Sequence, residues 1–167
     1  VVSGTTGWGD QLTNAKNICD DNEGTLLHSS NFSIGVNIVF AINRKLATMM
    51  NGHSQYGIMI EETHHINKKD APSGTAITLA NDILHRVERM GSWVNDVPEN
   101  KNQLSIISKR IDSVPGTHQV SYASKIDTID IVHTAHSRDG FALGAIKAAE
   151  YIKDRKGCFE MSDVLGL

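Results

Sequence analysis

The segment from residue 56 to residue 91 constrains the fold most, because the spacing of its apolar residues changes once, from that of a strand to that of a helix. Ile58 and Ile60 alternate as in a strand, and Pro72 suits the first turn of a helix that Gly91 ends. This helix carries one apolar stripe, formed by Ala76, Ala80, Ile83, Leu84 and Val87. The order of strand, polar loop and amphipathic helix predicts an α/β arrangement.

Further strands and helices are predicted on both sides of this segment. Strands are expected at 1–7 (with a turn), 25–28, 56–62, 104–111, 117–124 and 128–134, and further helices at 8–22, 35–51 and 141–153. The short connection through Pro115-Gly116 favours an antiparallel meander of the last three strands. Residues 92–103 are polar and rich in turn residues, and 164–165 form a short tail.

The order of these elements is α/β at both ends, with a block of strand, helix and three strands between them. We therefore predict a discontinuous arrangement, in which the two ends of the chain form one domain and the middle forms another. With 167 residues, of which 40% are hydrophobic and 21% charged, the chain is large enough to build a real core.

Charge and composition exclude several classes of protein. The net charge is -3, so nothing indicates a nucleic-acid surface, and no apolar run reaches the roughly 18 residues of a membrane span. The N-terminal residues have no basic region or apolar signal core. The two cysteines, Cys19 and Cys158, fit a reduced protein better than a disulfide scaffold. We expect a cytoplasmic protein without nucleic-acid or membrane partners, in which both cysteines are structural or inert.

The loop after the strand at 56–62 concentrates chemically active side chains. His64 and His65 end the strand, and Lys68 and Lys69 follow shortly after. An imidazole beside a bound anion can donate a proton near neutral pH. Adjacent strand residues point to opposite faces, so both histidines serve one site only if the chain twists there.

Ser73-Gly74-Thr75 lies where the helix begins. The first turn of a helix exposes backbone N–H groups and a partial positive charge. Gly74 allows a ligand to approach the backbone closely, and Thr75 adds a hydroxyl donor. Together with the upstream ammonium groups, these features predict a site that holds a small polyanion and hands it a proton.

Three other interpretations fit parts of this pattern. The segment could be only a loop and a helix cap with solvated lysines. A metal site could gather His64, His65, His133 and His136, but no HExxH or CxxC spacing accompanies them, so no metal is expected. Gly4-Thr5-Thr6-Gly7 is a weak phosphate-loop signal, because it lacks both the GxGxxG and the GxxxxGK-S/T patterns.

One stretch of the chain closely resembles the signature of bacterial dihydrodipicolinate reductases, E-x-H-H-x-x-K-x-D-A-P-S-G-T-A. The matching residues are Glu62-Thr63-His64-His65 followed by Lys68-Lys69-Asp70-Ala71-Pro72-Ser73-Gly74-Thr75-Ala76, and every fixed position is met. Stretches at 4–7, 31–37, 114–118 and 137–145 agree with the family in the same order. The resemblance runs essentially from end to end.

The resemblance implies an enzyme of lysine and diaminopimelate biosynthesis. Such enzymes reduce a cyclic dicarboxylate, 4-hydroxy-tetrahydrodipicolinate or dihydrodipicolinate, to tetrahydrodipicolinate with a hydride from NADPH or NADH. The motif match makes His64 the expected general acid–base and Lys68 a catalytic proton donor. The residues expected to bind the substrate carboxylates are His65, Lys68, Ser73, Gly74 and Thr75. The residues expected on the cofactor side are Gly4, Thr5, Thr6, Ser29, Ser30, Asn31, Phe32, Arg138 and Phe141.

The resemblance also implies a domain organisation. Residues 1–33 and 142–167 are expected to be the remnant of a Rossmann-type dinucleotide-binding domain with a parallel sheet. Residues 34–141 are expected to form an α+β substrate-binding and oligomerisation domain, with a mixed, largely antiparallel sheet flanked by helices. Family members are homotetramers joined through the sheets of this domain, so a homotetramer is expected.

The chain departs from the family at its N-terminus, where members carry a βαβ unit with a Gly-rich cofactor loop. Val1-Val2 look like the end of a buried strand, so the chain reads as a fragment. Weak or absent cofactor binding by this chain alone is therefore expected. The alternative function is a non-catalytic module that binds dicarboxylates and assembles but cannot bind the cofactor on its own.

Overall fold

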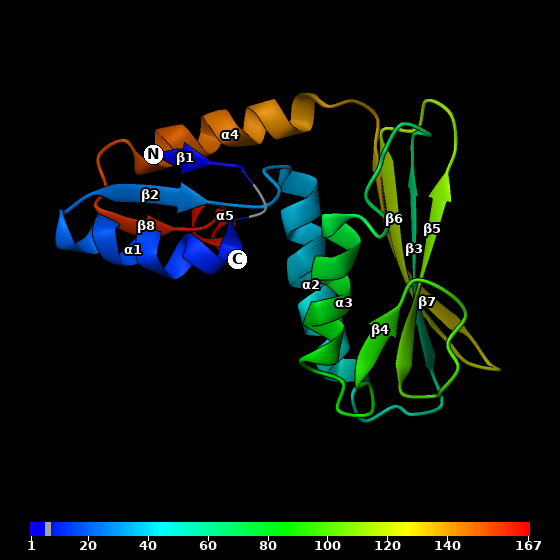
Figure 1. Ribbon diagram of the computed structural model, residues 1–167. Helices are drawn as coiled ribbons and strands as arrows, with labels where there is room; N and C mark the ends of the chain where they lie inside the picture. Colours follow the sequence, from blue (N-terminus) through cyan, green and yellow to red (C-terminus); the bar gives the residue numbers. More distant parts are fainter. Residues whose placement is uncertain (6–7) are drawn as a thin grey trace. The chain divides into compact units, whose positions relative to one another are not determined.

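The computed structural model describes residues 1–5 and 8–167 of the chain. Unit 1 contains residues 1–38 and 138–167, and unit 2 contains residues 39–137. Each unit has its own sheet, of three strands in unit 1 and of five in unit 2 (Figure 1). The predicted α/β class, with a parallel sheet at the chain ends and a mixed sheet in the middle, is confirmed.

Unit 1 is built on a parallel sheet with the strand order β1-β2-β8. The strands are β1 (Val2–Ser3), β2 (Thr25–His28) and β8 (Gly157–Phe159). The helices are the 3-10 helix η1 (Gly9–Gln11), α1 (Leu12–Asp21), α4 (Asp139–Ile152) and α5 (Met161–Leu165). Parallel neighbours need a crossover connection, which η1 and α1 supply between β1 and β2. The buried core consists of Leu27, Phe32, Ala148, Ile152 and Met161.

Two elements of unit 1 were not predicted. β8 has only three residues, too few for a period to show, and begins at Gly157 with a φ of 109°. α5 replaces the predicted tail, and a capping box between Glu160 and Asp163 fixes its first turn. The predicted turn at Gly4-Thr5-Thr6-Gly7 lies partly outside the described residues, since Thr6 and Gly7 are not among them.

Unit 2 is built on a mixed sheet with the strand order β4-β5-β3-β6-β7. The strands are β3 (Gly57–His64), β4 (Ser92–Val94), β5 (Gln103–Arg110), β6 (Gly116–Ala123) and β7 (Thr128–Ala135). The pairs β4–β5 and β3–β5 are parallel, and the pairs β3–β6 and β6–β7 are antiparallel. Antiparallel pairing therefore makes up half of this sheet.

The predicted meander is right for β6 and β7 and wrong for β5 and β6. β3 lies between β5 and β6, so that Ile60 is opposite Ile106 on one side and Val120 on the other. The connection from β5 to β6 crosses the end of β3, where the Ile111 N–H donates to the His64 carbonyl over 2.8 Å. A local turn signal cannot show that a strand from earlier in the sequence fills the gap between its flanking strands.

Two helices cover one face of this sheet (Figure 1): α2 (Ile34–Met50), whose residues from 39 onward belong to unit 2, and α3 (Gly74–Leu84). Buried side chains of the sheet under them are Ile58, Ile60, Leu104, Ile106, Val120 and Tyr122. The Asn43 amide donates to the Leu79 carbonyl over 3.1 Å and joins the two helices.

α3 ends at Leu84 rather than at Gly91, but the turns that follow still bury Val87. β4 then begins at Ser92, in a segment where the sequence predicted no element. Among the described helices, none has both the length and the apolar character needed to cross a membrane.

Candidate functional site

His64 is the last residue of β3 and lies on the face that the helices cover. Only 9% of the residue is exposed. Its Nδ1 atom pairs with the Glu62 carboxylate, and its ring meets the His118 ring edge to face, with 5.0 Å between centroids. Strand alternation explains the first contact, because residues i and i+2 share a face. The register explains the second, because Glu62 is paired with His118 across β3 and β6.

Glu62 is the buried anion of this site, with no exposed surface. Burial acts to raise the pKa of its carboxyl, but hydrogen bonds from His64, Ser108 and Arg110 outweigh burial and lower the pKa to about 2. Arg110 contributes Nη2, at 2.9 Å from Glu62 Oε1. Glu62 is thus a carboxylate at neutral pH. Its carboxylate can accept the Nδ1–H of His64, and Nε2 is then the other ring nitrogen.

Gly116 leaves room at the Nε2 atom of His64. A Cβ atom on Gly116 would lie 3.1 Å from Nε2, closer than an ordinary van der Waals contact. A larger residue here would press on the His64 ring at Nε2.

His118 is a buried, neutral neighbour of His64. Burial and the charge of His64 lower the pKa of His118 to about 3. Its Nε2 atom lies 3.0 Å from Ser73 Oγ. Ser73 also caps α3, since its Oγ atom accepts the Ala76 N–H over 3.2 Å. The Ser73 hydroxyl therefore already has hydrogen-bond partners within the protein.

Lys68 lies in the loop after β3 and is paired with Asp70. Its Nζ atom is 2.8 and 2.9 Å from the two carboxylate oxygens, and this ammonium lowers the pKa of Asp70. The Asp70 side chain is 60% exposed and that of Lys68 is 22% exposed. The Arg110 guanidinium donates to the Asp70 carbonyl over 2.7 Å and ties this loop to β5. The pair thus lies on the surface, where a ligand carboxylate can replace Asp70.

The N-terminus of α3 follows this loop after a cis Ala71–Pro72 bond. Gly74 is exposed, and no atom lies within 4 Å of the position that its Cβ would take. His65 is half-buried, and its carbonyl accepts the Lys68 N–H over 3.1 Å. The expected substrate residues thus lie on one continuous stretch of chain, around the end of β3 and the start of α3.

The residues expected to contact the cofactor all belong to unit 1. Gly4 and Thr5 follow β1, and residues 29–32 follow β2. β1 and β2 are parallel neighbours, so both loops leave the sheet at the same edge. The Ser29 hydroxyl donates to the Asn31 carbonyl over 2.7 Å and shapes the second loop. Thr6 lies outside the described residues.

Phe32 is part of the core of unit 1, with 7% of the residue exposed. A Cβ atom on Gly4 would lie 3.0 Å from its ring. Arg138 occupies the N-cap position of α4, and its carbonyl accepts the Phe141 N–H over 3.2 Å. Phe141 is 38% exposed. Phe32 therefore positions the loop from within the core, whereas Phe141 presents a ring at the surface of its unit.

The four-histidine metal site considered above is not formed. In the part of the chain that the structure describes, Glu62, His64 and His118 bring ligand atoms close together, as do Cys19, Asp20 and Cys158. Neither group contains His65, His133 or His136. In the first group Arg110 already neutralises the carboxylate.

Sequence reasoning assigned no role to Glu62, Arg110, Gly116 or His118. A signal for Glu62 was present, because a carboxylate two residues before a histidine in a strand shares its face. Arg110 and His118 depend on strand pairing between distant segments, which the sequence does not display. A depression of about 610 Å³ in unit 2 lies beside Tyr56 and Arg89, at the opposite end of β3 from His64.

Comparison with known proteins assigns this chain to a family. The family described as "Dihydrodipicolinate reductase, C-terminus" matches residues 35–165. The 4-hydroxy-tetrahydrodipicolinate reductase of Christiangramia forsetii is 52% identical over 165 residues, which are 99% of this chain and 69% of that protein. The chain belongs to the dihydrodipicolinate reductase family. The reductase of Campylobacter curvus is 36% identical and matches 100% of this chain and 67% of its own length.

A solved structure agrees with the family assignment at the level of the fold. The dipicolinate-bound dihydrodipicolinate reductase from Paenisporosarcina sp. TG-14 has a TM-score of 0.69 and 22% identity. The match covers 95% of this chain and 62% of that one. The chain thus spans about two thirds of the length of these dihydrodipicolinate reductases.

These matches confirm the predicted family and, with it, the predicted reductase function. Dihydrodipicolinate reductases are oxidoreductases of lysine and diaminopimelate biosynthesis that use a nicotinamide cofactor.

Proposed function

We propose that this chain is the substrate-binding and proton-transferring part of an NAD(P)H-dependent 4-hydroxy-tetrahydrodipicolinate reductase. The observation that carries the proposal is the buried Glu62–His64 pair, which directly precedes the Lys68 loop and the N-terminus of α3. In this assignment unit 2 is the substrate domain and unit 1 belongs to the dinucleotide-binding domain.

A cyclic dicarboxylate needs two anion-binding groups. Lys68 supplies one, because a substrate carboxylate can take the place of the exposed Asp70 carboxylate on its ammonium. The first turn of α3 supplies the other, since its N–H groups and partial charge favour anions and Gly74 leaves the backbone accessible. His65 and the Thr75 hydroxyl complete the proposed contacts.

His64 supplies the proton in this mechanism. Glu62 remains ionised because Arg110 pairs with it, and a carboxylate on Nδ1 stabilises the imidazolium that donates from Nε2. Lys68 holds the substrate carboxylate and serves as a second proton donor. The nicotinamide cofactor, when bound, supplies the hydride.

On the cofactor side we propose the loops after β1 and β2, with Gly4, Thr5, Thr6 and residues 29–32, together with Arg138 and Phe141. The sequence contains neither a GxGxxG nor a GxxxxGK-S/T motif, so we propose that no Gly-rich loop of this chain binds the cofactor phosphates. Both NADPH and NADH remain candidates. A biosynthetic role supports a cytoplasmic location.

We further propose a homotetramer joined through the sheet of unit 2. Met59 and Val132 are opposite the helix-covered face by strand alternation, and they are 39% and 55% exposed. Exposed apolar side chains on an open sheet face can be buried against a second copy of the chain.

Calorimetric titration with pyridine-2,6-dicarboxylate, a planar mimic of the substrate, tests the proposed binding site. The wild-type chain should bind one molecule, and Lys68→Ala should abolish the binding. Lys69→Ala is the matched control, because Lys69 is adjacent and exposed. Equal binding by wild type and Lys68→Ala would contradict the site.

A second function is a module that binds dicarboxylates and assembles without binding the cofactor. The missing Gly-rich motif favours it. Turnover by the full-length protein that contains this sequence separates the two functions, since reduction of the dicarboxylate with NADPH or NADH supports the reductase part, whereas dicarboxylate binding without reduction supports the module.

A further inference from the structure

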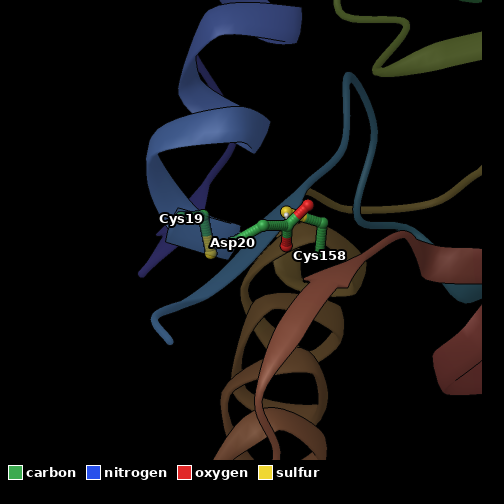
Figure 2. Close-up of side chains that lie close together, drawn as sticks. All are labelled: Cys19, Asp20 and Cys158. Atoms are coloured by element: carbon green, nitrogen blue, oxygen red, sulfur yellow. Dashed lines mark hydrogen bonds between the residues drawn. The ribbon is translucent and has the colours of Figure 1, made fainter. Parts of the chain in front are cut away.

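Unit 1 contains a cluster of two thiols and a carboxylate outside the site described above. Cys19 and Asp20 lie in the last turn of α1, and Cys158 is the central residue of β8 (Figure 2). The sulfurs of both cysteines and a carboxylate oxygen of Asp20 all lie within 4.8 Å of one another. Segments far apart in the sequence thus bring three ligand atoms together.

The thiols are held in place by the two elements. Cys19 Sγ lies 3.8 Å from the Gly157 carbonyl, and Cys158 Sγ lies 3.7 Å from the Lys16 carbonyl. Figure 2 shows the Asp20 carboxylate beside the Cys158 sulfur, and Oδ1 is 3.6 Å from it. In a tetrahedral zinc site, Zn–S bonds of about 2.3 Å place two sulfurs roughly 3.8 Å apart. Small side-chain rotations therefore suffice for coordination.

The end of α1 beside the cluster offers no compensating positive charge. The last turn of α1 contains no basic residue, and the carboxyl end of a helix favours a cation. Lys16, one turn earlier, pairs with Glu160 over 3.2 Å. The cluster thus collects groups that can become negative at a helix end that is itself partly negative.

These neighbours also make Cys158 a poor nucleophile. Burial, together with Cys19 and Asp20, raises the pKa of Cys158 to about 11. A protonated thiol exchanges slowly with disulfides, which disfavours a redox pair.

We propose that Cys19, Asp20 and Cys158 form a binding site for one thiophilic divalent cation of the Zn²⁺ type, with water as its fourth ligand. Two sulfurs and one carboxylate suit Zn²⁺ better than Mg²⁺ or Ca²⁺, which prefer oxygen ligands only. Binding forms two metal–sulfur bonds and releases two thiol protons to solvent. The cation connects β8 to the end of α1, so the two cysteines are ligands rather than inert.

Titration of the reduced chain with Co²⁺ tests this proposal, because thiolate coordination gives a sulfur-to-cobalt absorption band that histidine coordination does not. We expect the band to saturate at one ion per chain, to strengthen as pH rises, and to vanish when Zn²⁺ displaces Co²⁺. Cys19→Ser and Cys158→Ser should remove it. Asp20→Asn should weaken binding by about 10- to 100-fold, a loss typical of a disturbed metal site. Asp21→Asn, one residue further along α1, should leave it unchanged.

A second measurement uses only the wild-type chain and does not depend on how the variants fold. Zn²⁺ should protect both cysteines from alkylation by iodoacetamide, as counted by mass spectrometry. The proposal is overturned if the wild type gives no sulfur-to-cobalt band or its cysteines react equally fast with and without Zn²⁺. A disulfide between the two cysteines, formed in air in place of metal binding, would overturn it as well.

Discussion

Glu62 contributes both to the candidate site and to the stability of unit 2. It accepts hydrogen bonds from His64 and Arg110 while having no exposed surface. Removal of one partner from a buried ion pair leaves the other charge uncompensated. The same carboxylate that contacts the proposed proton donor, His64, therefore also pairs with Arg110.

Replacement of Glu62 by Gln keeps the shape and removes the charge. We expect the free energy of unfolding to fall by about 3 kcal/mol, because the half-buried Arg110 loses its counterion. Urea denaturation measures this loss. Glu61→Gln is the control, since Glu61 pairs with Lys109 on the exposed face and its loss should cost at most about 1 kcal/mol. Equal losses in the two variants would contradict the assigned role of Glu62.

His118 should make stability depend on pH. Burial lowers its pKa from 6.5 to about 3, so below pH 6.5 the unfolded chain binds a proton that the folded chain does not. Stability should therefore decrease as pH falls from 6.5 towards 3, and Glu62 should add a further decrease between pH 4.5 and 2. Urea midpoints at pH 7 and pH 5 test this. The decrease should be smaller in His118→Gln, and an identical decrease would be against the argument.

At the scale of elements, helix α4 depends on one glycine. A Cβ atom on Gly144 would lie 1.8 Å from the Phe32 carbonyl oxygen, whereas one on Gly140 would lie 3.7 Å from its nearest neighbour, Ser33 Oγ. The two positions share a helix but differ in what they face.

This difference predicts opposite effects of the same substitution. Gly144→Ala should destabilise unit 1 by about 1–3 kcal/mol or more through overpacking against the backbone. Gly140→Ala should stabilise it by up to about 1 kcal/mol, since alanine is the better helix former. Thermal unfolding of both variants is the measurement. A stabilised Gly144→Ala would show that α4 does not pack on this loop.

The sequence predicted the positions of helices and strands better than it predicted which strands pair with each other. Periodicity located most of the strands and helices. Ile58 and Ile60 show the alternation of a strand, and the apolar stripe of α3 shows the spacing of a helix. It missed β4 and β8, which have three residues each. It paired β5 with β6 because nothing local indicates that β3 lies between them. The family motif predicted His64, His65, Lys68 and the start of α3 as site residues. Arg110 and His118 could not be predicted in this way, because only the strand register places them beside Glu62 and His64.

At the scale of the whole molecule, the open face of the unit 2 sheet predicts assembly. Val132→Lys places a charge at an exposed apolar position of this face and should dissociate the proposed homotetramer, as read from light scattering. Val97→Lys is the control, because Val97 is 73% exposed and lies outside the strands. A wild-type chain that scatters as a monomer would contradict the prediction.

The measurement that tests the central claim most directly is the turnover of His64→Gln in the full-length reductase that contains this sequence. The proposed general acid predicts a fall in turnover by a factor of about 10² to 10⁴, the usual contribution of such a group. His53→Gln, at an exposed turn, should be unaffected. If His64→Gln turned over substrate as fast as the wild type, the proton would come from another group and the role given to the Glu62–His64 pair would be wrong.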